Sequence, residues 1–248
     1  MMRFSDIHSH FVYGIDDGAQ TRADMEAMLD AAWKDGVAEL TATPHVTPGV
    51  YAFDEALFSA HLEEARQYCR RRGYAMRLHA GAENLYTPAL RRYAEEQRLT
   101  TIGDSRCVLL EFSPSIAYGE IAEAVSLLER CGYTPVLAHV ERYRALRGFR
   151  LRRLREETSA LFQINCATIL PGSALQARMR AWRWLRAGLI DCVATDSHDC
   201  GRRASRMMQA YALLAKRCGA DDAARLTGGL PDAARSGDQG EDERESAR

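Results

Sequence analysis

Residues 107–139 read CVLLEFSPSIAYGEIAEAVSLLERCGYTPVLAH, and this stretch decides the fold. The apolar runs at 107–112 and 134–139 have the length of buried strands. Between them, GEIAEAVSLLERCG carries apolar residues at three- and four-residue spacing and closes with Gly132, which is the pattern of an amphipathic helix. A strand, a helix and a second strand in this order predict a parallel pair joined by a helical crossover.

The same alternation runs along most of the chain. Strands are predicted at residues 3–10, 37–43, 76–83, 107–112, 134–139, 161–165 and 192–198, and helices at 23–36, 54–73, 88–97, 119–132, 180–188 and 202–219. Strict alternation of this kind favours a mainly parallel sheet that closes, or nearly closes, into a barrel. No internal repeat or low-complexity linker divides the chain, so a single α/β domain is expected over residues 1–230.

Composition and charge exclude several classes of protein. The 248 residues carry a formal net charge of −1, which gives no general attraction to nucleic acid or to an anionic membrane. The apolar runs fall far below the roughly 18 residues of a membrane helix, and the N-terminus lacks a signal peptide, so a cytoplasmic protein without membrane insertion is expected. Seven cysteines without a C-x-x-C pair indicate neither a disulfide framework nor a thiolate zinc site. Residues 231–248 are acidic and poor in apolar residues, which predicts a disordered tail.

Histidines and carboxylates gather at the predicted strand ends. Side chains two apart on a strand share a face, which places Asp6, His8 and His10 together on the first strand. The carboxyl ends of parallel strands in a barrel open onto one face, where active sites lie. The candidate metal ligands at these ends are His8, His10, Asp17, His45, Glu83, Glu111, His139, Asp196 and His198.

Each of these residues taken alone is more often an ordinary polar side chain at a strand end. Taken together they are not ordinary, because lysine and arginine are about as common in the chain as acids, yet none occupies these positions. So many carboxylates would repel one another without cations. Because one ion takes only about four to six ligands, two or three divalent ions are expected, and imidazole mixed with carboxylate suits Mn, Fe or Zn.

Spacing leaves two assignments open. Asp16 and Asp17 cannot be separated by their position, although Asp17 is preferred as the ligand. Glu141 is a rival to His139, because it lies two residues further on. His79 has the strand parity of a ligand but lies deeper in its strand, so it is expected in the core.

Eight short motifs occur along the chain in the order DIHSH, GIDDG, TPH, GAE, LLEF, AHVERY, QIN and ATDSH. In order and spacing they resemble the polymerase-and-histidinol-phosphatase (PHP) superfamily. More narrowly, they resemble its bacterial manganese-dependent protein tyrosine phosphatases of capsule and exopolysaccharide operons, the CpsB type. The resemblance implies a distorted (β/α)7 barrel in which the nine residues above bind three metal ions. It also implies that Arg142 and Arg202 bind phosphate, and His45 is predicted to serve catalysis as well as metal binding.

The chain departs from this family at two places: the final Gly-Arg pair is not followed by proline, and the Asn-Pro segment that commonly closes these domains is missing. The predicted activity is hydrolysis of phosphotyrosine on a partner protein by a metal-bridging hydroxide. The resemblance implies that the partner is the tyrosine-rich tail of the autokinase of polysaccharide export. Tyrosines 13, 51, 86, 118 and 143 are candidates for aromatic walls of an open pocket.

Two other functions stay open. One is a phosphatase of small substrates such as histidinol phosphate, and the other is an inactive metal-folded module that binds the kinase tail. Residues 141–157 hold seven arginines, which form either a solvated helix face or a surface that steers an acidic substrate. The oligomeric state cannot be inferred from the sequence.

Overall fold

The computed structural model describes residues 3–231 and residue 234. The strands are β1 (Phe4–Ser9), β2 (Val37–Ala42), β3 (His45–Val46), β4 (Arg77–Ala80), β5 (Glu83–Leu85), β6 (Cys107–Glu111), β7 (Thr134–Leu137), β8 (Leu161–Asn165) and β9 (Cys192–Ala194). The helices are α1 (Arg22–Lys34), α2 (Glu55–Arg72), α3 (Leu90–Glu95), α4 (Tyr118–Arg130), α5 (Arg150–Glu157), α6 (Cys166–Ile169), α7 (Leu175–Arg186), α8 (Met207–Cys218) and α9 (Ala220–Leu226), with 3-10 turns η1 (Val140–Arg142) and η2 (Arg144–Leu146). Most of the tail predicted at 231–248 lies outside the described residues, so its disorder and the boundary at residue 230 stay predictions.

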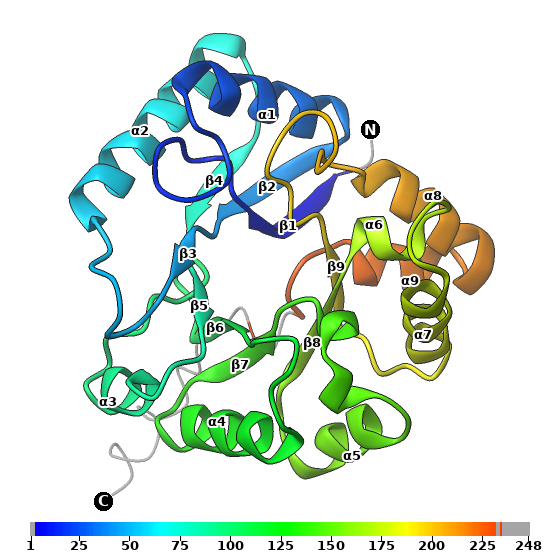
Figure 1. Cartoon of the computed structure of the whole chain (residues 1–248). Coiled ribbons are helices and arrows are strands. Elements are labelled where there is room, and N and C mark those ends of the chain that lie inside the picture. Colours follow the sequence, from blue (N-terminus) through cyan, green and yellow to red (C-terminus); the bar gives the residue numbers. More distant parts are fainter. Residues whose placement is uncertain (1–2, 232–233, 235–248) are drawn as a thin grey trace, which may run out of the picture.

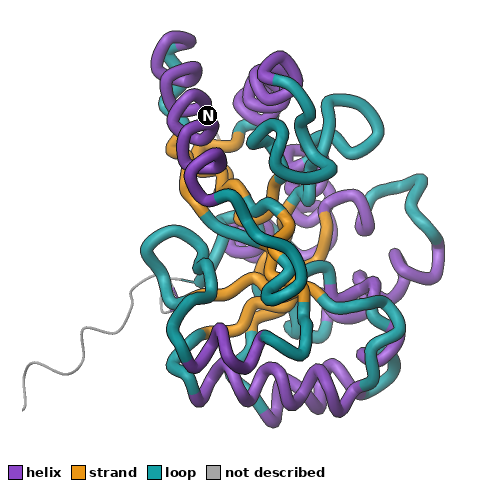
Figure 2. The backbone as a smooth tube through the Cα atoms, turned by 60° about the vertical axis from the view of Figure 1, so that its left-hand side comes forward, coloured by secondary structure: helices purple, strands orange, loops and turns teal. Residues whose placement is uncertain are grey.

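The paired strands run parallel to one another in two sheets, β1-β2-β4 and β3-β5-β6-β7-β8-β9. The sheets meet where β1 lies beside the end of β9. There the amide of His10 donates to the carbonyl of Ser197, and the amide of Asp196 donates to the carbonyl of His8, both at 2.9 Å. The strands curl around a common axis with helices outside them (Figures 1 and 2), which confirms the predicted α/β barrel class.

Two of the predicted strands are divided. Residues 76–83, predicted as one strand, form β4 and β5, which belong to different sheets, and β2 is followed by the separate short strand β3. Gly81 lies at the division of β4 from β5, and a Cβ atom there would lie 2.9 Å from Cγ2 of Thr41. Pro44, which has no N–H to donate, separates β2 from β3. The prediction of one continuous strand at 76–83 was wrong because the chain changes its pairing partner at this point.

The alternation of side chains along β6 explains how the candidate ligand Glu111 comes to point into the barrel. Val108 and Leu110 pack in the large core cluster that includes the buried face of α4. Cys107 and Leu109 belong to a second cluster that contains inward residues of β7 and β9. Because side chains alternate between the faces of a strand, Glu111 continues the inward series at the carboxyl end.

The helices end at recognisable signals. Thr21 and Asp24 form a capping box at the start of α1, and the side chain of Asp54 caps α2. Gly73 ends α2 in the left-handed conformation, with φ 69°. In the part of the chain that the structure describes, no helix is long and apolar enough to cross a membrane.

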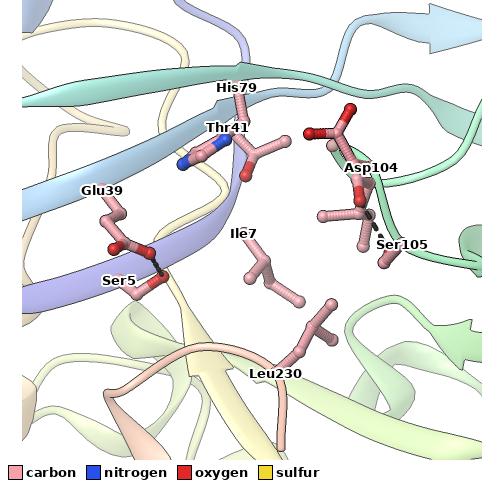
Figure 3. A pocket seen from close by; sticks show the side chains of 10 residues that line it. Ser5, Ile7, Glu39, Thr41, His79, Asp104, Ser105 and Leu230 are labelled. Atoms are coloured by element: carbon pink, nitrogen blue, oxygen red, sulfur yellow. Dashed lines mark hydrogen bonds between the residues drawn. The ribbon is translucent and has the colours of Figure 1, made fainter. Parts of the chain in front are cut away.

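A cavity of about 180 Å³ lies at the amino end of the barrel (Figure 3). Ile7 and Leu230 extend toward it, and Ser5 donates a hydrogen bond of 3.4 Å to Glu39 at its edge. His79, predicted in the core, is instead half-buried and lines this cavity. The cavity is therefore separate from the strand ends that carry the candidate ligands.

Candidate metal centre

The carboxyl ends of the strands and the loops that follow them bring the nine candidate ligands together. They form four groups, in each of which one possible ligand atom per residue lies within 4.8 Å of the others: His10, Asp17, His45 and His198; His8, Glu83 and His139; His8, His10 and Asp196; and His45, Glu83 and Glu111. Each of the nine belongs to at least one group. Because His8, His10, His45 and Glu83 each belong to two groups, the four groups form one continuous cluster.

Glu83 lies at the middle of the cluster and is completely buried. Its Oε1 accepts a hydrogen bond from Nε2 of His139 at 2.8 Å, and its Oε2 lies 3.2 Å from Nε2 of His8 and 3.1 Å from Nδ1 of His45. Burial alone would raise the pKa of Glu83, but these imidazoles outweigh burial and hold its pKa well below the usual value. The carboxyl group is therefore ionised and able to bind a cation.

His8 and His10 are each held by one ring nitrogen and present the other to the cluster. Nδ1 of His10 donates to Oδ2 of Asp16 at 2.6 Å, and Nδ1 of His8 lies 3.3 Å from Oε1 of Gln163. Four buried atoms of the candidate ligands have no hydrogen-bond partner among the described residues: His8 Nε2, His10 Nε2, His198 Nε2 and Glu83 Oε2. Buried polar atoms without partners cost free energy, so this donor set fits a resident cation.

The two adjacent aspartates have different environments. Asp16 accepts hydrogen bonds from the ring of His10 and from the amides of Gly18, at 2.9 Å, and His45, at 3.0 Å. Asp17 is 63% exposed in its side chain, and its Oδ1 lies 3.4 Å from Nε2 of His45. Asp16 therefore positions the candidate ligands His10 and His45, whereas Asp17 is itself a candidate ligand.

Gly18 allows this loop to fold back on β1. A Cβ atom at Gly18 would lie 2.0 Å from the carbonyl oxygen of His10 and 2.5 Å from its Cβ. The next residue, Ala19, donates its amide to that same carbonyl at 3.0 Å. The glycine of the GIDDG motif is therefore needed to bring both aspartates to the end of β1.

Two candidate ligands lie in strained backbone. His139 has φ 32° and Asp196 has φ 52°, which are left-handed values that few residues other than glycine adopt. These conformations end β7 and β9 earlier than predicted, at Leu137 and Ala194. Local strain of this kind is typical of functional sites, where the surrounding contacts hold it in place.

Strand β8 provides no candidate ligand but orients its neighbours. Oε1 of Gln163 accepts the amide hydrogen of His139 at 2.7 Å, and Nε2 of Gln163 donates to Oδ1 of Asn165 at 2.8 Å. Nδ2 of Asn165 donates to Oδ2 of Asp196 at 2.7 Å. Sequence reasoning missed both roles, although the alternation of residues 163 and 165 on one strand face, in the QIN motif, was the available signal.

Asp6 connects strands and does not hold an imidazole. Its Oδ1 accepts the amide of Thr195 at 3.0 Å, its Oδ2 accepts the hydroxyl of the same residue, and Asp6 also accepts the amide of His8. Burial raises the pKa of Asp6 to about 6, against the opposing effect of these bonds. The pairing of β1 with β2 is irregular between Asp6 and Ser9. Asp6 shares a strand with His8 and was expected to orient a histidine through its ring; it contacts the backbone amide of His8 instead.

The arginines at the cluster differ in part from those predicted. Arg142 forms an ion pair with Oδ2 of Asp196. Arg203, rather than the predicted Arg202, lies 3.1 Å from Oδ1 of Asp196 and 3.6 Å from Oδ2 of Asp17. Arg202 is exposed, and the hydrogen bonds and ion pairs found within the described part of the chain do not include it. The sequence shows two adjacent arginines and cannot tell which of them turns inward.

Glu141, the rival to His139, is held outside the four ligand groups. Its Oε1 accepts the amide of Asn165 at 3.1 Å and the hydroxyl of Thr168 at 2.8 Å. Its side chain therefore accepts hydrogen bonds at the start of α6.

An open pocket of about 350 Å³ lies beside His45 and Asp16. Its apolar lining includes Tyr51 and Phe53, and Tyr51 is 77% exposed. Tyr143, another candidate for an aromatic wall, is instead fully buried, with its hydroxyl 3.3 Å from Nδ1 of His139. Of these two tyrosines, only Tyr51 is placed to contact a substrate.

A parallel α/β barrel that gathers five histidines and four carboxylates at its strand ends is the architecture of a metal-dependent hydrolase. The chain belongs to the capsular polysaccharide synthesis CpsB/CapC family, whose model matches residues 4–233. It is 31% identical over 232 residues to tyrosine-protein phosphatase CpsB of Streptococcus pneumoniae, covering 89% of this chain and 93% of that relative.

Solved structures agree with this membership. The chain superposes with a TM-score of 0.82 and 28% identity, over 91% of both chains, on a crystal structure from work on YwqE of Bacillus subtilis and CpsB of Streptococcus pneumoniae, described there as metal-dependent tyrosine phosphatases. Histidinol phosphate phosphatase of Lactococcus lactis, solved with zinc, L-histidinol and phosphate, gives a TM-score of 0.57 at 15% identity, over 88% of this chain and 94% of that one. The second likeness shows the fold alone.

Proposed function

We propose that this protein is a metal-dependent phosphatase that removes phosphate from phosphotyrosine on a partner protein. The observation that carries the proposal is the cluster of nine possible ligands with Arg142 and Arg203 at its edge, in a chain whose relatives are named tyrosine-protein phosphatases. The partner that fits this family best is the tyrosine autokinase of polysaccharide export. The enzyme would act on it in the cytoplasm, through a catalytic domain of residues 1–230.

Two or three divalent ions would be held by the nine ligands, because four overlapping groups exceed what one ion can use. Manganese is the first candidate, with iron and zinc as alternatives, since imidazole and carboxylate ligands suit all three. Ions bound here would lower the pKa of a coordinated water and neutralise phosphate oxygens. His45, which joins two of the groups and faces the open pocket, is the ligand best placed to reach the substrate side of the centre.

The arginines would bind the phosphate group. Arg142 and Arg203 are both partly exposed and both contact Asp196, so each can turn a guanidinium group toward a phosphate at the cluster. A guanidinium there stabilises the charge that develops during phosphoryl transfer. Arg202, which the family resemblance implied for this role, faces solvent, and Arg203 takes its place in the proposal.

The leaving group sets what else the site must supply. Tyrosine leaves as a phenolate whose conjugate acid has a pKa of about 10, so a strong general acid is not essential. An alkyl phosphate such as histidinol phosphate has a poorer leaving group, so its hydrolysis depends more strongly on a general acid. The pocket beside His45, with Tyr51 and Phe53 in its lining, would accept the aromatic ring.

Turnover of two substrates by the same metal-loaded protein tests this proposal. We expect a phosphotyrosine peptide to be hydrolysed with a higher kcat/KM than histidinol phosphate. His139→Ala should abolish the activity and lower the metal content, because His139 is a proposed ligand. Preference for histidinol phosphate would assign the small-substrate function, and binding of a phosphotyrosine peptide without turnover would assign the inactive binding module.

A further inference from the structure

An arginine surface lies at one edge of the metal centre. It consists of Arg144, Arg147 and Arg150, which are exposed along η2 and the start of α5, and Arg180 of α7, which is half-buried. Two other arginines of the same run are neutralised: Arg153 pairs with Glu157, and Arg155 pairs with Asp191. By contrast, the four arginines of the surface take part in none of the ion pairs found within residues 3–231.

The surface adjoins the proposed phosphate-binding residues. Nη2 of Arg180 donates to the carbonyl oxygen of Glu141 at 2.6 Å, directly beside Arg142. The amide of Arg144 donates to the carbonyl of Pro114, in the loop that follows Glu111 at the end of β6. An anion held by this surface would therefore lie next to the metal centre.

The positive charge is only partly compensated among the described residues. Nε of Arg180 is buried and has no hydrogen-bond partner among the described residues. Burial lowers the pKa of Arg180, and the charge of the nearby Arg147 lowers it further; together they outweigh the opposing effect of Glu141. Oε1 of Glu141, the carboxylate that acts on Arg180, already accepts two hydrogen bonds. A solvated helix face would pair its arginines with acids, whereas the four arginines of this surface form no ion pair among the described residues, and Arg147 lies near enough to Arg180 to lower its pKa.

We infer that the arginine surface binds acidic residues that flank the phosphotyrosine in the substrate chain, an inference that rests on the proposed function. An extended chain advances about 3.3 Å per residue, so residues a few positions from a tyrosine bound at the centre can reach this edge. The exposed side chain of Phe149, at 70% accessibility between Arg147 and Arg150, offers an apolar contact to the same segment. Whole-molecule attraction cannot replace the surface, because the net charge of the chain is −1.

Two matched phosphotyrosine peptides test the inference, one flanked by Asp and Glu and the other by Asn and Gln at the same positions. For the metal-loaded full chain at low ionic strength, we expect kcat/KM for the acidic peptide to be about tenfold higher. Because salt screens exposed charges, the preference should shrink markedly as ionic strength rises from about 0.01 M to about 1 M. Turnover of p-nitrophenyl phosphate, which has no flanking residues, should not share the preference.

Arg147→Glu is the test variant, and Arg130→Glu is its control with the same change in charge. Arg147 is exposed and outside the proposed catalytic machinery, whereas Arg130 is exposed at the end of α4, at the opposite end of the barrel. We expect Arg147→Glu to remove most of the preference for the acidic peptide, with turnover of p-nitrophenyl phosphate unchanged, and Arg130→Glu to keep the preference.

Equal kcat/KM for the two peptides in the unmodified protein overturns the inference, and so does an equal loss of preference in both variants. If neither peptide is hydrolysed, it is the proposed function that fails. Fluorescence anisotropy of the same peptides then decides the inference separately: tighter binding of the acidic peptide supports it, and equal binding overturns it.

Discussion

Oδ2 of Asp16 lies 2.6 Å from Nδ1 of His10, while its neighbour Asp17 turns its carboxylate toward the other histidines of the cluster. Adjacent residues of the same type thus have different roles, one in positioning a ligand and one as a proposed ligand. The division depends on the turn at Gly18, whose lack of a side chain lets the loop close on the carbonyl of His10.

The two aspartates should respond differently to the same substitution. Asp17→Asn should weaken manganese binding and leave the melting temperature of the ion-free protein unchanged, because Asp17 is largely exposed. Asp16→Asn should lower both the manganese affinity and the melting temperature of the ion-free protein, because Asp16 also fixes His10, Gly18 and His45. The loss in metal affinity should be roughly 10- to 100-fold. Isothermal titration and thermal denaturation in chelator measure the two quantities. If Asp17→Asn lowered the melting temperature of the ion-free protein and Asp16→Asn did not, the division of roles would be refuted.

Gln163 should affect metal binding without being a ligand. Gln163→Leu removes the acceptor beside His8 and the bond to the amide of His139, so metal affinity should fall by roughly 10- to 100-fold. Gln176→Leu, at an exposed position on α7, is the control and should bind metal normally. Unchanged affinity in Gln163→Leu would show that β8 does not orient the ligands.

Tyr51 should recognise the aromatic part of the substrate. Tyr51→Ala should lower kcat/KM for phenyl phosphate by roughly 3- to 10-fold, the effect of about one aromatic contact, and leave the value for glycerol phosphate unchanged. Val50→Ala, at an exposed neighbour that does not line the pocket, is the control. An equal loss on both substrates would mean that Tyr51 acts on the fold or the metals instead of the ring.

The ion-free protein should lose stability as pH rises from 6.5 through about 9. Burial alone would lower the pKa values of His10 and His45, but hydrogen bonds that their rings donate to neighbouring carboxylates, including Glu83, raise both to about 9. The folded state then binds more protons than the unfolded chain, so the stability they contribute is present below pH 6.5 and disappears above 9. Burial and the charge of His10 lower the pKa of His198 to about 4, so it stays neutral across this range.

Divalent ions should oppose this trend. Metal binding needs neutral imidazoles, so manganese affinity should rise over the same pH interval and protons should be released on binding. Thermal melting at pH 6, 7.5 and 9, with chelator and with manganese, measures both effects. A melting temperature of the ion-free protein that climbs over this range would contradict the assigned charge state.

Much of the fold could be predicted from the periodicity of residues 107–139 and of the segments like it, because buried strands and amphipathic helices have different apolar spacing. The division at Gly81 could not, since it depends on the contact with Thr41 on a strand far away in the sequence. Strand parity was a reliable guide on β6 and an unreliable one on β1, where the pairing is irregular beyond Asp6.

The candidate site was predictable in its residue types and less so in their orientation. Histidines and carboxylates at strand ends are visible in the sequence, and the structure gathers all nine predicted candidates. Which of Arg202 and Arg203 turns inward depends on the loop that precedes α8, and local spacing does not encode it. The role of Gln163 could not be predicted, because in the sequence an amide that orients a candidate ligand cannot be distinguished from any other buried polar residue.

The most direct test of the central claim is the number of metal ions per chain, measured by elemental analysis of purified protein and paired with phosphotyrosine turnover on the same samples. The account predicts two or three divalent ions per chain, loss of turnover when a chelator removes them, and recovery with manganese. A protein that holds less than one ion per chain and still hydrolyses phosphotyrosine at full rate after chelation would contradict it.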